Sequence, residues 1–314
     1  MPMLDYESCA KLLLTHENIL VVTHQHPDGD TAACAAALCS ALRRGGRRAC
    51  MFPNPEMGRK LLPYCEKYYA PEGFRPKYVV SVDVAEEKLL SKGFEGTVDL
   101  CIDHHPSNTH FAKESLVQGE KASCAQIVME IIQNINPDLT PEEATVLYVG
   151  LSTDTGCFQY GNTDEAAFLA AAELARAGAD CMKVNTAFFR RVSQARLKLE
   201  GLIFESLRFY RGGTISVATV TLDMLQKAGA ADDDLDMLAG LAGRAENSLV
   251  SITVREKEDG TCRVSVRSGP EVNSCDICAV FGGGGHAMAA GCTVNGSPGH
   301  VRELLVQVAE EAFR

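Results

Sequence analysis

Three short apolar runs of this chain are each followed closely by a histidine or an aspartate, residue types that can bind metal ions. No other feature of the sequence limits the possible folds as strongly. The runs cover residues 19–22, 77–82 and 97–102. Continuous apolar runs of this length are typical of strands buried on both faces of a parallel sheet. His24, Asp83 and Asp103 follow them. Because ligands of open α/β sheets bind at the carboxyl ends of strands, we expect one site at that edge.

The segments between these runs have mainly helical patterns. This predicts an α/β fold that begins with a mainly parallel sheet flanked by helices. A further strand is expected at residues 48–52. The expected helices cover residues 5–16, 31–43, 123–133, 141–151 and 163–177.

The pattern changes after a helical stretch at residues 195–211. Alternating strands are then expected at residues 214–221, 249–255 and 262–267, and helices at 235–244 and 301–312. This order is typical of a smaller α+β domain. The predicted division is a catalytic domain of residues 1–185, a helical linker of residues 186–212 and a second domain of residues 213–314.

The loop after the first strand holds the densest group of candidate ligands. Pro27 and Gly29 fold this loop tightly, which brings His24, Asp28 and Asp30 toward one point. The structural alternative is a turn in which Asp30 caps the following helix. Capping accounts for one carboxylate and leaves the other two side chains unexplained.

Asp83, the run Asp103-His104-His105 and Asp154 extend this set of candidate ligands. Each stands at the end of a predicted strand or helix. Carboxylates and imidazoles together suit Mn²⁺ and, less exclusively, Mg²⁺, Co²⁺ or Zn²⁺. The alternative is a group of unrelated acids at strand ends beside a capping and a solvated histidine.

Composition narrows the class of protein. The net charge of −11 argues against a basic track for long nucleic acid, and it leaves room for a small phosphorylated substrate at one local site. The 13 cysteines lie in apolar segments, which favours a reducing cytoplasm over a disulfide framework. Cys275-x-x-Cys278 has zinc or redox spacing, but no second pair completes a zinc site, so packed thiols are the preferred interpretation. We expect neither a secretory signal nor a membrane span.

A run of four glycines near the C-terminus ends in His286. Gly283, Gly284 and Gly285 fit either a tight turn or a backbone nest that binds a phosphate. His286 and Arg267 on the preceding strand would add donors to such a site, although a solvated strand arginine is equally common.

Phe158, Tyr160 and Asn162 follow Asp154 closely and are candidates for contacts with a nucleobase. A core phenylalanine and a surface tyrosine are equally good interpretations of the first two.

Taken in order along nearly the whole chain, these residues resemble the DHH phosphoesterase superfamily with a DHHA1-type C-terminal domain. The four motifs of the first domain correspond to His24-x-x-x-Asp28-x-Asp30, Asp83, Asp103-His104-His105 and Asp154. Gly282–His286 with Ala289-Ala290-Gly291 resembles the substrate-binding motif of the small domain. The chain departs from the family at Ala33-Cys34, where Gly-Ser is frequent, and this change concerns helix packing more than ligands.

The resemblance implies a two-metal site with Mn²⁺, for which Mg²⁺ or Co²⁺ can substitute. His24 and Asp28 would hold one ion, a second set would hold the other, and Asp83 would bridge them. That second set is Asp30, His104 and Asp154. Two ions about 4 Å apart activate a shared water and clamp phosphoryl oxygens.

The resemblance also implies roles for the remaining residues. Asp103 and His105 would orient His104 or meet a phosphate oxygen. The substrate-binding residues of the small domain would be Arg267, Gly283, Gly284, Gly285 and His286.

Within the superfamily, the layout is most similar to the nanoRNase and oligoribonuclease group. This implies hydrolysis of short RNA oligomers to mononucleotides and, in some members, removal of the 3′-phosphate of adenosine 3′,5′-bisphosphate. The alternatives are a phosphodiesterase of cyclic di-AMP or its linear product pApA, and a non-catalytic nucleotide-binding protein. The glycine-rich motif disfavours a family II pyrophosphatase, whose small domain carries a motif rich in Arg and Lys.

The partners that this resemblance implies are short oligoribonucleotides or small nucleotides, with no long duplex nucleic acid and no membrane. A homodimer remains an open alternative.

Overall fold

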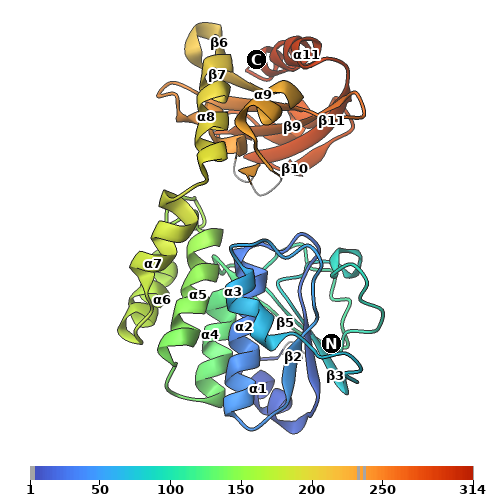
Figure 1. Ribbon diagram of the computed structural model, residues 1–314, viewed down its shortest axis with the longest axis vertical. Helices are drawn as coiled ribbons and strands as arrows, with labels where there is room; N and C mark the ends of the chain where they lie inside the picture. The colour runs from blue at the N-terminus through green and yellow to red at the C-terminus, as the bar shows by residue number, and fades with distance from the viewer. Residues whose placement is uncertain (1–3, 232–233, 236–237, 314) are drawn as a thin grey trace. The chain divides into compact units, whose positions relative to one another are not determined.

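The computed structural model describes residues 4–231, 234–235 and 238–313. The chain divides into two compact units, Met1–Arg191 and Val192–Arg314. Each unit has one sheet with helices packed against it, as Figure 1 shows in blue to yellow-green and in yellow to red. In the part of the chain that the structure describes, no helix is long and apolar enough to cross a membrane.

The sheet of the first unit is parallel throughout, with the order β2-β1-β3-β4-β5. Its central strands are apolar and buried, because helices and loops cover both faces. The parallel sheet that the apolar runs predict is therefore confirmed. The strands are β1 (Ile19–Val22), β2 (Ala49–Met51), β3 (Tyr78–Val82), β4 (Leu100–Asp103) and β5 (Glu114–Val117).

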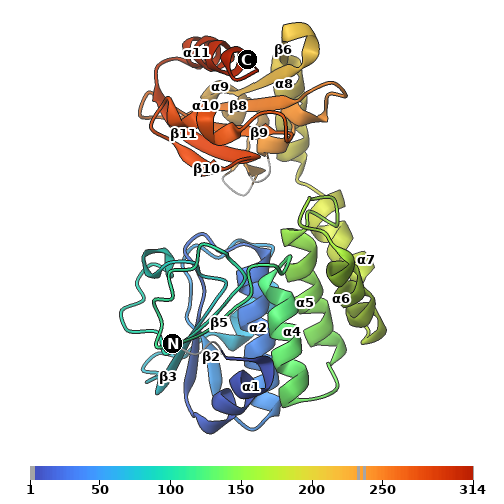
Figure 2. The same ribbon diagram turned by 180° about the vertical axis from the view of Figure 1, so that it is seen from behind.

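Helices of the first unit pack closely because small side chains line their contacts. α2 is rich in alanine, and its buried face lies beside α4 and α5 in both views (Figures 1 and 2). At Gly150 of α5, an added Cβ would lie 2.7 Å from Asp30 Oδ1. The α-helices are α1 (Tyr6–Thr15), α2 (Gly29–Arg44), α3 (Leu62–Cys65), α4 (Cys124–Ile135), α5 (Pro141–Asp154), α6 (Glu165–Arg176) and α7 (Cys181–Asn185).

The connections between the later strands differ from the prediction. We expected mainly helical connections between the strands, but a 3₁₀ turn, Glu87–Leu89, and loops join β3 to β4. Irregular backbone also joins β4 to β5, a strand that the sequence analysis did not predict. The helical pattern was wrong here because this stretch packs as loops over the apolar residues Leu20, Val79 and Cys101.

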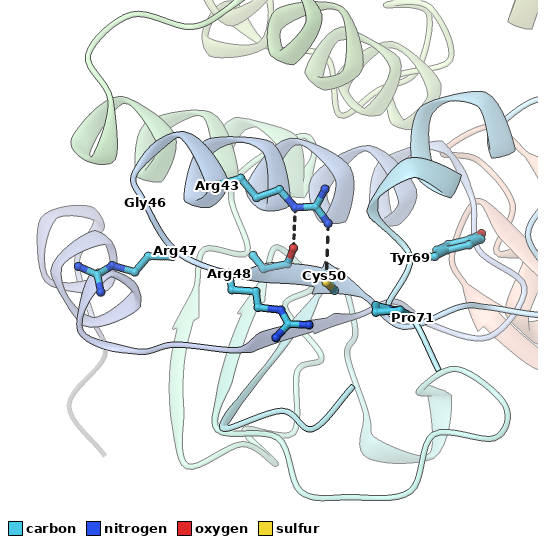
Figure 3. A pocket seen from close by; sticks show the side chains of 8 residues that line it. Arg43, Gly46, Arg47, Arg48, Cys50, Tyr69 and Pro71 are labelled. Atoms are coloured by element: carbon cyan, nitrogen blue, oxygen red, sulfur yellow. Dashed lines mark hydrogen bonds between the residues drawn. The ribbon is translucent and has the colours of Figure 1, made fainter. Parts of the chain in front are cut away.

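The outer edge of β2 borders a pocket of about 550 Å³. Figure 3 shows Arg43 reaching down from α2 onto this edge. Its Nε donates to Ala49 O at 2.8 Å, and its Nη2 contacts Cys50 Sγ at 3.7 Å. A charged side chain that occupies edge carbonyls protects an exposed strand from pairing with other chains. Arg43 therefore covers part of this strand edge.

The sheet of the second unit is mixed, with the order β10-β11-β9-β8-β7-β6. β7 and β8 are parallel, and the other neighbours are antiparallel. The strands are β6 (Arg208–Tyr210), β7 (Ile215–Val220), β8 (Val250–Glu256), β9 (Thr261–Ser268), β10 (Gly284–His286) and β11 (Ala289–Asn295). The helices are α8 (Gln194–Ser206), α9 (Leu222–Ala228), α10 (Ser274–Ala279) and α11 (Pro298–Glu311).

Two expectations for this unit need correction. The helix predicted for residues 195–211 ends at Ser206, whose hydroxyl accepts from Thr219 N of β7 and approaches Thr219 O, each at 3.0 Å. A serine hydroxyl competes in this way with the helical backbone, and β6 follows. The helix predicted for residues 235–244 falls partly outside the described residues, and the described part holds two 3₁₀ turns, Leu238–Gly240 and Ala242–Arg244.

Candidate metal centre

The neighbouring strands β1, β3 and β4 bring their carboxyl ends to one edge of the first sheet. His24 follows β1, Asp83 follows β3, and His104 follows β4. His24 Nε2 lies 3.7 Å from Asp83 Oδ2, and His104 Nε2 lies 3.4 Å from Asp83 Oδ1. Asp83 therefore presents one carboxylate oxygen to each imidazole.

Two helix ends complete the cluster. Asp28 caps α2, and its Oδ1 accepts from the backbone N–H groups of Asp30 and Thr31. The predicted alternative in which Asp30 caps this helix is wrong. Asp30 is instead buried within the first turn, with its Oδ2 4.0 Å from His104 Nε2. Asp154 ends α5, and its Oδ2 lies 3.5 Å from the same nitrogen.

The ligand atoms fall into overlapping groups whose members all lie within 4.8 Å of one another. The three groups are His24–Asp28–Asp83, Asp30–His104–Asp154 and Asp83–His104–His105. All six candidate metal ligands of the sequence analysis are thus brought together. Five of them, all except Asp30, line a pocket of about 190 Å³.

The buried carboxylates of the cluster favour the binding of positive charge, either as protons or as a cation. Burial and neighbouring carboxylates raise the pKa of Asp30 well above its usual value. They raise the pKa of Asp154 to about 7, although His104 opposes this shift. Burial lowers the pKa of His24 and of His104, but adjacent carboxylates outweigh it and raise these pKa values to about 9 and about 10. Protons thus accumulate here when no other cation is bound.

One further observation indicates that the cluster is suited to a divalent cation. Asp83 Oδ1 is buried and has no hydrogen-bond partner among the described residues. A buried carboxylate oxygen without a partner is costly, and a coordinated cation removes that cost. Asp83 also has a left-handed backbone, with φ of 58°, which costs free energy and is retained mainly at functional sites.

Hydrogen bonds orient both histidines toward the cluster. Nδ1 of His24 lies 2.7 Å from Gln25 O, and Nδ1 of His104 lies 3.0 Å from Lys121 O. Donation to these carbonyls places the proton on Nδ1 and leaves Nε2 free to bind a metal.

Asp103 and His105 lie beside the cluster and interact with each other. Asp103 is fully buried, and its Oδ1 lies 2.7 Å from His105 Nδ1. Asn108 Nδ2 donates to the other oxygen of Asp103 at 2.6 Å. The hydrogen bond that His105 donates to Asp103 raises the pKa of His105, which favours an imidazolium at the rim of the pocket. His105 is 40% exposed and so accessible to a substrate.

The residues that hold Asp30 were not among those predicted from the sequence. Backbone N–H groups of Cys124 and Ala125, at the start of α4, donate to its two oxygens at 2.6 and 3.0 Å. Cys34, one turn further along α2, donates its thiol to Oδ1 at 3.4 Å. The spacing of four residues between Asp30 and Cys34 is a helical contact that the sequence already carried.

A second missed group supports the loop that carries His24. Nδ2 of the buried Asn54 lies 2.9 Å from His24 O and 3.0 Å from the hydroxyls of both Thr23 and Ser91. These three polar side chains are almost fully enclosed. They tie the end of β1 to two distant loops, so they position His24.

The loop after Asp154 separates the three candidate base contacts. Phe158 packs between Tyr148 and Phe168, in agreement with the core interpretation. Tyr160 is 50% exposed, and Asn162 donates to the backbone oxygen of Asp154 at 3.2 Å. Tyr160 is therefore more accessible to a ligand than Phe158, which is partly buried against the core.

The glycine-rich segment of the second unit forms a strand. Gly284–His286 pair with β11, and the Gly283 N–H donates to Cys278 O at 2.9 Å. An added Cβ at Gly283 would lie 2.3 Å from Gly291 O, and one at Gly285 would lie 2.5 Å from Ala289 O. Close approach to β11 thus explains two of the glycines, and the Gly283 N–H is not free for an anion.

Arg267 and His286 lie on one cross-strand row, since both are paired with Ala289 of β11. Both are exposed. Cys278 is buried against Cys292, with which it shares a hydrogen bond. Among the described residues, no group of metal ligands forms around Cys275 and Cys278.

Comparisons with known proteins agree with this geometry. The profile of the DHH family, N-terminal domain, matches residues 18–151, and that of the DHHA1 domain matches residues 212–314. A bifunctional oligoribonuclease and PAP phosphatase NrnA from Thermus thermophilus is 34% identical over 282 residues, which cover 88% of this chain and 84% of the relative. The protein of the same name from Bacillus subtilis is 26% identical and covers 89% and 90% of the two chains.

Among solved structures, an exopolyphosphatase-related protein from Bacteroides fragilis is similar over 98% of this chain and 96% of its own. The TM-score is 0.87 at 20% sequence identity. At this identity, the likeness concerns the fold alone.

Proposed function

Since this chain belongs to the DHH family and carries a DHHA1 domain, we propose that it is a metal-dependent phosphoesterase that hydrolyses short oligoribonucleotides to mononucleotides. The observation that carries this proposal is the convergence of six candidate ligands in two groups, His24–Asp28–Asp83 and Asp30–His104–Asp154. The groups meet where His104 Nε2 lies 3.4 Å from Asp83 Oδ1. The same site would serve removal of the 3′-phosphate from adenosine 3′,5′-bisphosphate.

The proposed cofactor is a pair of Mn²⁺ ions, for which Mg²⁺ or Co²⁺ can substitute. His24 and Asp28 would hold one ion and His104, Asp30 and Asp154 the other, with Asp83 shared between them. Four ionised carboxylates balance two divalent cations, and both imidazoles are neutral as ligands. A centre that is close to neutral accepts an anionic phosphodiester without strong repulsion.

The bound ions would supply an activated water and charge stabilisation at the phosphoryl group. Other groups of the site orient the two ligand histidines and donate a hydrogen bond to the substrate. Lys121 O and Gln25 O hold the two ligand imidazoles in the required tautomer. His105, kept protonated by Asp103, would donate a hydrogen bond to a phosphate oxygen.

The net negative charge of the chain favours short oligonucleotides as substrates over long ones. A net charge of −11 opposes the approach of long polyanions, whose binding depends on many phosphate contacts. The two relatives named above are oligoribonucleases, which supports the same substrate class.

The test is phosphodiester hydrolysis by purified protein that has been stripped with EDTA and then supplied with Mn²⁺. We expect no release of mononucleotides from an RNA trimer after stripping, and recovery when Mn²⁺ is added back. Elemental analysis of the reloaded protein should give two metal ions for each chain. Full hydrolysis by the stripped protein in the presence of EDTA would refute the proposal.

A further inference from the structure

A basic segment lies in the first unit of an otherwise acidic chain. Residues 43–77 include nine lysine or arginine residues and three glutamates, whereas the whole chain has a net charge of −11. Part of this segment lines the pocket of about 550 Å³ at the outer edge of β2. Arg43, Arg47 and Arg48 are among the lining residues, and none of the described residues that line the pocket is acidic. Such a concentration of positive charge attracts anions.

The pocket is separate from the metal centre because it lies at the other end of α2. Gly29 begins α2 beside the cluster, and Arg43 lies in the last turn of this helix. The two residues are 14 positions apart, which corresponds to about 21 Å at about 1.5 Å per residue. Arg48 precedes β2 and so lies at the amino end of the parallel sheet, whereas the cluster lies at the carboxyl end. An anion in this pocket therefore does not occupy the metal centre.

Arg43 is held in place by uncharged partners and keeps free donors. Its Nε donates to Ala49 O at 2.8 Å, and its Nη1 donates to Lys67 O at 3.3 Å. Its Cζ also lies 5.0 Å from the centre of the Tyr68 ring. With the contact between Nη2 and Cys50 Sγ, three of the five N–H groups of the guanidinium are engaged and two remain. Among the described residues, no salt bridge neutralises Arg43.

Arg48 keeps all of its side-chain donors. Its Cζ lies 5.1 Å from the centre of the Phe74 ring, so a cation–π contact supports the guanidinium. No salt bridge or side-chain hydrogen bond involves Arg48 in the part of the chain that the structure describes. Glu17, which accepts from the backbone N–H of Arg48 at 3.5 Å, is paired with Arg47 at 2.6 Å. Arg43 and Arg48 are thus the two cations of the pocket without a carboxylate partner.

The shape of the pocket suits a small organic anion. In Figure 3 the guanidinium groups of Arg43 and Arg48 lie above and below Cys50, and Pro71 lies beside them. Cys50 is buried, and Tyr69 and Pro71 also line the pocket. Guanidinium donors recognise phosphate oxygens, and ring side chains offer surface to an organic group. The volume of about 550 Å³ is within the range of about 300–1,000 Å³ that is usual for sites of small ligands.

We propose that this pocket binds a small organic phosphate monoester of the size of a nucleoside monophosphate, with its phosphate between Arg43 and Arg48. A phosphate monoester carries a charge of about −1.5 to −2 at pH 7, which matches two guanidinium groups. Each phosphodiester of an RNA backbone carries a single negative charge and matches them less well. The organic group would lie against Pro71. The inference does not depend on the proposed function, because the pocket is distinct from the metal centre.

Isothermal titration calorimetry of the full chain, stripped with EDTA and titrated with AMP as the probe, tests this site. Arg48→Gln and Arg43→Gln should each weaken the binding of one AMP per chain about tenfold or more, since each removes charge-assisted hydrogen bonds to the phosphate. Arg48→Lys should recover part of the affinity because it restores the charge. The matched control is Arg75→Gln, which removes an exposed charge of the same segment outside the pocket and should bind AMP like wild type.

Arg48→Gln is the decisive variant, since the Arg48 side chain supports no backbone group whereas that of Arg43 holds the edge of β2. Its Tm should equal that of wild type, which shows that the loss of binding is local. Adenosine lacks the phosphate and should bind at least tenfold more weakly than AMP. The site would be overturned by a wild-type protein that does not bind AMP, by unchanged affinity in both variants, or by equal affinity for adenosine and AMP. Hydrolysis of RNA by the protein with Mn²⁺ is measured separately, so failure of this site and failure of the proposed function are distinguishable.

Discussion

Asp83→Asn is the perturbation that separates a shared metal ligand from an ordinary buried acid. Each oxygen of Asp83 faces a different imidazole, at 3.7 and 3.4 Å. Asparagine has the same shape and tolerates the left-handed backbone of this position, so the substitution causes little strain. It removes the charge that both ions would share, and we expect both ions to bind far more weakly.

The magnitude follows from linkage between binding and stability. A ligand at 100 times its Kd stabilises a protein by about 2.7 kcal/mol, so two ions contribute about 5 kcal/mol. In a unit of roughly 190 residues, each kcal/mol moves Tm by about 2–4 °C. Saturating Mn²⁺ should therefore raise the Tm of the wild-type first unit by about 10–20 °C.

Thermal unfolding with Mn²⁺ and with EDTA measures this difference. Asp83→Asn should lose nearly all of the metal-dependent rise, while Asp154→Asn should lose about half, because Asp154 belongs to one group of ligands. Activity of Asp83→Asn should fall at least 10³-fold, which corresponds to about 4 kcal/mol of transition-state stabilisation. The control Asp138→Asn removes an exposed carboxylate and should match wild type in both assays.

Two outcomes would refute this reasoning. One is a full metal-dependent rise in Tm for Asp83→Asn, which would mean that Asp83 is not a ligand. The other is more than a tenth of wild-type activity in a variant that binds no metal.

Three further predictions concern the same unit. Without metal, the folded protein raises the pKa of Asp154 from 3.8 to about 7 and that of His104 from 6.5 to about 10. Their contribution to stability is therefore complete at low pH and is lost as the pH rises through the folded pKa values. Chemical denaturation in EDTA should show a falling free energy of unfolding from pH 5 to pH 10. With Mn²⁺ the metal-dependent part should instead rise through pH 7, since ligands must lose protons, and a flat difference between the two curves would contradict the site. Gly150→Ala should lower Tm by several degrees and reduce activity, because its Cβ would meet Asp30 Oδ1 at 2.7 Å and overpacking costs about 1–3 kcal/mol; Gly201→Ala in α8, where nothing lies within 4 Å, is the control and should be neutral or stabilising by up to about 1 kcal/mol.

The candidate metal ligands were predictable because their position follows from local rules. Apolar runs end where strands end, and the carboxyl ends of parallel neighbours meet at one edge. This reasoning places His24, Asp83 and His104 together without knowledge of distances. Asp154 ends a helix rather than a strand, so the strand-edge rule does not by itself place it beside them.

The supporting contacts were not predictable, because they join segments far apart in the chain. Asp30 is held by backbone N–H groups of Cys124 and Ala125, and no side-chain pattern marks a backbone donor. Asn54 meets Ser91 across 37 residues in a buried network that depends on how two loops fold. Contacts of this kind arise from tertiary packing alone.

Missed strands have a similar cause. β5 is four residues long and begins with a glutamate, so its pattern is too short to be recognised. β10 consists of two glycines and a histidine, none of which favours a strand, and its conformation comes from pairing with β11. In both cases the neighbouring strand supplies the hydrogen bonds that the local sequence does not specify.

A substrate panel would show whether this protein hydrolyses short RNA at the Asp/His cluster. The panel holds 5′-labelled RNA of two to five nucleotides, a 24-mer, cyclic di-AMP, pApA, adenosine 3′,5′-bisphosphate and pyrophosphate, each with purified protein and Mn²⁺. We predict conversion of the short RNAs to mononucleotides, with the 24-mer largely spared. Hydrolysis of cyclic di-AMP with the short RNAs left intact would contradict the account and assign the protein to turnover of cyclic dinucleotides.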